Sequence, residues 1–149
     1  MNSFECFTPD RAPVVVEIKF QEILLHFADR TESLSLNAST GDLNAVRHYL
    51  REAIRSAPIA IAQRAVIWLG RLGSPWTMLM LEALGSPRIH VRRSATYALD
   101  NGRDQFQKNA VDALSHAAGN DPDPVVQRVA WDSLFHFGGG ETDGVPAWT

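Results

Sequence analysis

Histidine is the side chain of this 149-residue chain best suited to bind a metal or to transfer a proton near neutral pH. The five histidines are scattered, one to each predicted element: His26, His48, His90, His116 and His136. No two of them have the i, i+4 spacing that places two imidazoles on one face of a helix. The sequence therefore predicts no metal site.

The other reactive side chains form no catalytic set either. Asp121 and Asp123 stand at the start of a predicted helix, where the helix dipole favours negative charge, and no order of serine, histidine and acid suggests a nucleophile. Gly138–Gly140 follow a predicted helix, whereas a phosphate-binding loop would open one. The single cysteine, Cys6, excludes an internal disulfide and a cysteine-based zinc site. We therefore expect no enzyme, no catalytic residues and no cofactor.

The composition is that of one ordinary globular domain. Hydrophobic residues make up 45% of the chain and charged residues 21%. The formal net charge of −3 argues against nucleic acid as a partner, because nucleic-acid proteins usually carry a basic balance. Glu5, Asp10 and Glu17 interrupt the apolar residues of the N-terminus, and no long apolar run occurs elsewhere. We expect a cytoplasmic protein that does not associate with a membrane.

One sequence motif of nine residues occurs three times along the chain. It spans Ile61–Leu69, Val91–Leu99 and Val126–Leu134, and each copy places aliphatic and small residues at helical spacing. Equivalent positions lie 30 and 35 residues apart, and each copy follows another stretch of helical periodicity. A single helix pair could not bury its apolar face, so the sequence predicts three stacked pairs over residues 40–138.

Residues 13–30 carry an apolar stripe that fits a leading helix. Val16, Phe20, Ile23, Leu24 and Phe27 recur at helical spacing. The run from Val14 to Phe20 alone would fit a strand, but the stripe continues beyond it and nothing else in the chain offers a strand to pair with. The remaining segments are expected to be a loose arm (1–12), a connection (31–39) and a flexible glycine-rich tail (139–149). The predicted fold is all-α, one domain over residues 1–138 with about seven helices and no sheet.

The third copy of this motif, with the residues just before it, resembles the D-x-x-P-x-V-x-x-x-A-x-x-x-L signature of HEAT repeats. The matching residues are Asp121, Pro124, Val126, Ala130 and Leu134. The second copy is similar with its proline displaced, and the spacing is near that of the short HEAT-like repeats of bilin lyases. The resemblance covers roughly residues 40–138. It implies a right-handed α-solenoid superhelix of antiparallel helix pairs, whose second helices line a concave face that holds a partner.

The resemblance also implies one structural ion pair between repeats. In HEAT-like stacks the acidic residue before one repeated helix commonly meets the arginine that follows the conserved aliphatic residue of its neighbour. Here these residues are Asp121 and Arg92. The first copy has Ser56 and Ala62 at the corresponding positions, so no such pair can form there. We expect the stability of the protein to depend on Asp121 and hardly at all on Ser56.

The solvent side of the repeated helices is the candidate partner site. At 100° per residue, Arg93, Thr96, Tyr97 and Asp100 point away from the apolar stripe of their helix, toward the groove or solvent. With their counterparts in the other copies, the predicted partner-binding residues are Gln63, Ile67, Arg93, Thr96, Tyr97, Asp100, Arg128, Trp131 and Asp132. Arginine, tyrosine and tryptophan often anchor protein interfaces, which suggests a non-catalytic module that holds one protein partner. Its size would suit an inhibitor or immunity protein for a bacterial toxin or enzyme.

Three alternatives remain open at this stage. Trp131 could instead pack on the C-terminal tail, and Ile67 on the leading helix. The basic cluster of Arg88, His90, Arg92 and Arg93, joined by Arg103 and Arg128, could bind DNA, although acidic neighbours would offset its field. An accessory enzyme of the bilin-lyase kind would require a tetrapyrrole-sized groove and reactive side chains.

Overall fold

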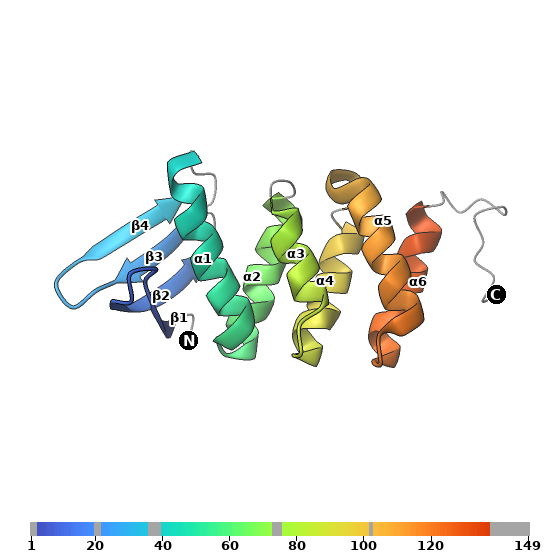
Figure 1. Ribbon diagram of the computed structural model, residues 1–149, viewed down its shortest axis with the longest axis horizontal. Helices are drawn as coiled ribbons and strands as arrows, with labels where there is room; N and C mark the ends of the chain where they lie inside the picture. Colours follow the sequence, from blue (N-terminus) through green and yellow to red (C-terminus); the bar gives the residue numbers. More distant parts are fainter. Residues whose placement is uncertain (1–2, 20–21, 36–39, 73–75, 102, 138–149) are drawn as a thin grey trace. The chain divides into compact units, whose positions relative to one another are not determined.

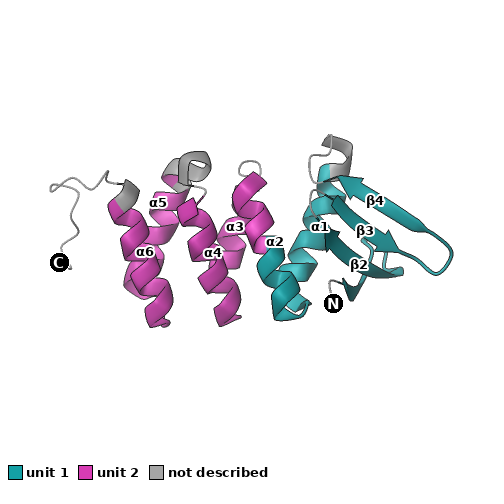
Figure 2. Cartoon of the chain, turned by 180° about the vertical axis from the view of Figure 1, so that it is seen from behind, with its two compact units in different colours: residues 1–65 teal, residues 66–149 magenta. Residues whose placement is uncertain are grey.

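The computed structural model describes residues 3–19, 22–35, 40–72, 76–101 and 103–137, without the side chains of 40–42, 103–107, 109 and 136–137. The chain forms two compact units, residues 1–65 and residues 66–149 (Figure 2). The predicted tail at 139–149 lies outside the described residues.

The first unit contains an antiparallel sheet of four strands in the order β1-β2-β3-β4 (Figure 1). The strands are β1 (Ser3–Phe7), β2 (Pro13–Lys19), β3 (Glu22–His26) and β4 (Thr31–Ser35). In the middle of the sheet Phe4 is opposite Val16, which is opposite Leu25. The prediction of an all-α fold without a sheet is therefore wrong, as are the loose arm at 1–12, the leading helix at 13–30 and the connection over Thr31–Ser35.

The alternation of buried side chains explains why this segment forms strands. Val14, Val16 and Ile18 are buried on β2, and Ile23 and Leu25 are buried on β3, whereas the residues between them are more exposed. A period of two places these side chains on one face of a sheet. β-branched residues pack well there, so valine and isoleucine favour the strand.

A tight turn joins β1 to β2 and contains a strained residue. The N–H of Ala12 donates to the Thr8 hydroxyl oxygen, and the N–H of Arg11 donates to the Thr8 carbonyl, both at 2.8 Å. Arg11 has φ of 70°, in the left-handed region where glycine is normally found. Pro9 and Asp10 supply the preceding turn positions, which both residue types favour.

Helix α1 (Thr40–Ser56) packs on the sheet of the first unit, and α2 (Ile59–Leu72) follows it after a turn at Pro58. The inner side chains of α1 are Val46, Tyr49, Leu50 and Ala53, all buried. The Nε2 atom of His48 bonds to the carbonyl oxygen of Phe7 at 2.8 Å, which ties α1 to the end of β1. Local sequence periodicity predicted these helices correctly.

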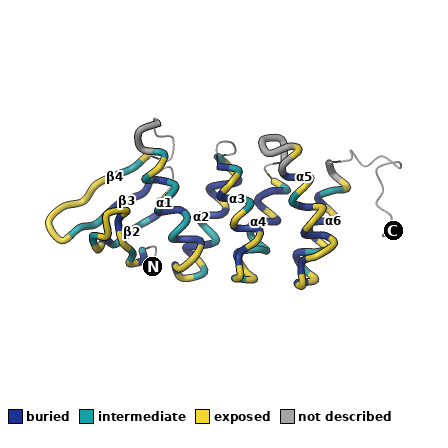
Figure 3. Tube along the Cα trace, viewed as in Figure 1, coloured by how far each residue is buried: buried dark blue, intermediate teal, exposed yellow. Residues whose placement is uncertain are grey.

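The second unit holds two antiparallel helix pairs (Figure 1). They are α3 (Thr77–Leu84) with α4 (Ile89–Asn101), and α5 (Arg103–Asn120) with α6 (Pro124–Phe137). Buried and exposed stretches alternate along each of these helices (Figure 3). Gly70 at the end of α2 lies against α4, where an added Cβ would come within 3.0 Å of the Ala98 Cβ. The described residues thus contain six helices rather than the seven that we expected.

Candidate partner-binding surface

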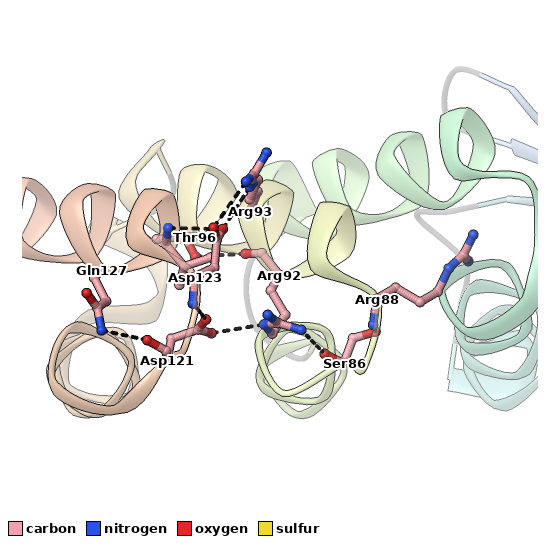
Figure 4. Close-up of polar contacts among 9 residues, drawn as sticks. Ser86, Arg88, Arg92, Arg93, Thr96, Asp121, Asp123 and Gln127 are labelled. Atoms are coloured by element: carbon pink, nitrogen blue, oxygen red, sulfur yellow. Dashed lines mark hydrogen bonds and ion pairs between the residues drawn. The ribbon is translucent and has the colours of Figure 1, made fainter.

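Two arginine–aspartate pairs join α4 to the start of α6, and Figure 4 shows them side by side. In the first, Nε of Arg92 donates to Oδ2 of Asp121 at 3.0 Å, and Nη1 of Arg92 donates to the Ser86 carbonyl at 3.0 Å. The other carboxylate oxygen of Asp121 accepts the N–H of Asp123 at 2.8 Å. The Arg92 and Asp121 side chains are only 14% and 7% exposed. The structure therefore contains the pair that the HEAT resemblance implied.

The second pair was not predicted. Arg93 donates to Asp123 through Nε at 2.7 Å and Nη2 at 3.0 Å, which is a bidentate contact. The hydrogen bonds from Arg93 lower the pKa of the Asp123 carboxyl to about 2, from its usual value of 3.8. The Asp123 side chain is 3% exposed and the Arg93 side chain 34%, so the carboxylate is buried while the arginine lies at the edge of the helix stack. The sequence did contain a signal for this second pair. A second arginine, Arg93, stands beside Arg92, and a second acidic residue, Asp123, stands close to Asp121.

Two of the other three α4 residues expected on the groove, Thr96 and Asp100, also make internal contacts. Thr96 is fully buried and its hydroxyl donates to the carbonyl of Arg92 at 2.7 Å, so its predicted solvent position is wrong. Asp100 accepts a hydrogen bond of 2.8 Å from the hydroxyl of Ser133 on α6. Asp100 and Arg93 thus tie α4 to the α6 segment, and the Thr96 hydroxyl is satisfied within its own helix, which leaves these side chains poorly placed to bind a partner.

Three predicted residues at equivalent positions are exposed on successive second helices. Ile67 on α2 is 48% exposed and Tyr97 on α4 is 49% exposed. Asp132, at the same position of α6, is exposed as well. We refer to Ile67, Tyr97 and Asp132 as the second-helix strip. Two large apolar side chains at this exposure contribute little to the core and are available for contact.

The remaining predicted residues differ in their exposure. Arg128 is exposed on α6, and Trp131 is half-buried one turn further along. Gln63 is half-buried and belongs to the first unit. Packing of Ile67 on a leading helix is excluded because no such helix forms at 13–30. Packing of Trp131 on the tail concerns residues beyond those described.

Reactive groups do not gather in the described part of the chain. No three His, Cys, Asp or Glu side chains there lie close enough together to hold a metal ion. Burial raises the pKa of Cys6 to about 11, so its thiol stays protonated near neutral pH and is a poor nucleophile. No helix in the described ranges combines the length and the apolar character needed to cross a bilayer.

A hollow of about 490 Å³ opens between α3 and α5. Its walls include Leu84 and Ala117, and its charged groups include Arg92 and Asp121. Arg92 and Asp121 are bonded to each other. We therefore interpret the hollow as part of the junction between two repeats and not as a ligand site. The same bonds weaken the case for DNA, since Arg92 and Arg93 of the proposed basic cluster are each neutralised by an aspartate.

Comparison with known protein families agrees with the repeated helices. The family profile described as HEAT repeats matches residues 48–134, which is more than half of the chain. The chain belongs to the HEAT-repeat family. No curated protein and no solved structure matches it. HEAT repeats are commonly scaffolds for protein interaction and are generally not catalytic. Membership of the HEAT-repeat family therefore supports a binding role and leaves the partner to be found from the surface.

Proposed function

We propose that this HEAT-repeat protein is a non-catalytic module that holds one partner protein on the second-helix strip. The observation that carries the proposal is the matched exposure of Ile67 and Tyr97 at equivalent positions of α2 and α4. An aromatic and a branched aliphatic side chain supply large contact areas, and desolvating them on binding is favourable. Asp132 would add a polar contact at the rim.

An inhibitor or immunity protein is the specific role that we favour. A short stack of helix pairs presents a rigid surface built on secondary structure, so little conformational entropy is lost when it covers a target. The partner would then be an enzyme or toxin whose active surface the module blocks.

Photo-crosslinking tests the strip directly. A benzophenone amino acid replaces Tyr97 in the organism of origin, and a second variant carries it at Met78 on α3, which is 68% exposed. We expect one protein to be captured from position 97 and not from position 78. The double variant Ile67→Asp with Tyr97→Asp should then lose that protein from pull-downs, whereas Met78→Asp should retain it. Capture from both positions alike, or retention by the double variant, would refute the proposal.

A further inference from the structure

Helix α6 carries a stripe of side chains that is only half-buried, whereas the equivalent stripe on α4, the preceding repeated helix, is buried. On α4 the stripe includes Thr96 and Leu99, which are 0% and 1% exposed. The residues at the same positions of α6, 35 places later in the chain, are Trp131 and Leu134, and both are half-buried. The difference follows from the order of the helices, because α4 is followed by another helix pair and no helix follows α6 among the described residues.

Helix α2 shows the same pattern as α4. Val66 and Leu69 occupy these stripe positions and both are fully buried. The stripe is therefore the surface on which each repeat receives the next one. On α6 a tryptophan and a leucine stand at these positions and both are half-buried, which is a composition typical of interfaces.

Arg128 adds a charge of defined position to this surface. It stands on α6 where Arg93 stands on α4, and it is exposed. Arg93 receives the carboxylate of Asp123, the residue just before the first turn of the next helix, with two hydrogen bonds. An arginine in that place is thus complementary to a carboxylate at the start of an incoming helix. The contact between α4 and α6 therefore indicates what kind of helix α6 can bind.

We propose that Arg128, Trp131 and Leu134 form an end face that docks a helix of a partner protein, one with an acidic residue at its start. The partner helix would lie beside α6 as α6 lies beside α4, with its carboxylate on Arg128 and its apolar side chains on Trp131 and Leu134. The α6 helix of a second copy fits less well, because the carboxylate at its start is already bound to Arg93 and is 3% exposed. This surface adjoins the second-helix strip on α6, where Arg128 stands one turn before Asp132, and it adds a second binding function to the first.

Crosslinking from the end face tests the proposal. The benzophenone amino acid is placed at Trp131 in the full chain, with Met78 as the control position, and the crosslinked peptide is identified by mass spectrometry. We expect a helical segment of another protein with aspartate or glutamate at or just before its first turn. Arg128→Glu should lower the yield of this adduct at least tenfold, whereas Arg128→Lys should retain much of it, because a lysine keeps the charge without the bidentate geometry.

The other outcomes each overturn the proposal. An adduct with residues 138–149 of the same chain would make the tail the occupant, and an adduct with residues of a second copy would make the face a self-association surface. If the adduct still formed with Arg128→Glu, or if no adduct formed at all, the partner would not be a helix with an acidic residue at its start. A chain truncated after Phe137 should still give the proposed adduct. Capture from position 97 without capture from position 131 would refute this inference alone and leave the second-helix strip in place.

Discussion

Replacing Asp121 with alanine should destabilise the protein more than any exposed substitution, since two buried groups depend on its carboxylate. Arg92 would lose a charge-assisted bond of 3.0 Å, and the N–H of Asp123 would lose its acceptor at 2.8 Å. A hydrogen bond to a charged group contributes about 1.5–3 kcal/mol, and a buried N–H left without a partner costs about 1–3 kcal/mol. Arg92 keeps its bond to the Ser86 carbonyl, so the sum is an upper bound. We expect a loss of about 3 kcal/mol in the free energy of unfolding.

Urea denaturation followed by circular dichroism at 222 nm measures this loss, and two variants sharpen it. Asp121→Asn keeps an oxygen for the N–H of Asp123 but removes the charge, so about half of the effect should remain. Ser56→Ala changes the equivalent position of the first repeat, which is exposed, and should cost less than about 0.5 kcal/mol. If Asp121→Ala and Ser56→Ala were equally stable, the pair with Arg92 would be a surface contact without energetic weight and our reasoning would be wrong.

Three further predictions concern other parts of the chain. Because the bonds from Arg93 hold the pKa of Asp123 near 2, this carboxylate stabilises the fold above pH 4 and the contribution is lost as the pH falls from about 4 to 2. Urea midpoints of the wild type and Asp123→Asn should therefore differ at pH 6 and converge only as the pH falls to about 2, and a constant difference would contradict this. Gly70→Ala should cost about 1–3 kcal/mol, because its Cβ would meet Ala98 at 3.0 Å, whereas Gly119→Ala, with no atom within 4 Å, should be neutral or stabilising by up to about 1 kcal/mol in thermal melts. Arg11→Gly should be about 0.5–1 kcal/mol more stable than Arg11→Ala, since only glycine adopts φ of 70° without strain, and equal stability of the two variants would show that the turn relaxes.

The repeated helices could be predicted because their signal is local. Ala65, Ala95 and Ala130 recur at equivalent positions and all are fully buried where helices meet. A period of 3.6 residues and the prolines between helices are contained in short stretches of sequence, and they do not depend on distant partners. The family resemblance rested on the same positions, and the match over residues 48–134 confirmed it.

The sheet was missed because its evidence is not local. Val16 and Ile23 fit both a helical stripe and an alternating strand, and the choice between them depends on whether partner strands exist. β1 and β4 are only five residues each and carry polar side chains, so neither stands out as a strand alone. Once paired, they satisfy the backbone groups of β2 and β3, and the strand conformation becomes the stable one.

The local periodicity of the sequence was enough to predict the repeated helices, and the HEAT resemblance implied that Arg92 would meet Asp121. Tertiary structure alone decided which polar residues are used within the stack. Thr96 and Arg93 lie on the side of α4 that faces α6, so one is buried and the other binds Asp123. Trp131 and Arg128 occupy the same positions on α6, yet they reach the surface. The residue positions are equivalent, and the physical difference is that α6 packs beside α4, whereas no helix follows α6 among the described residues.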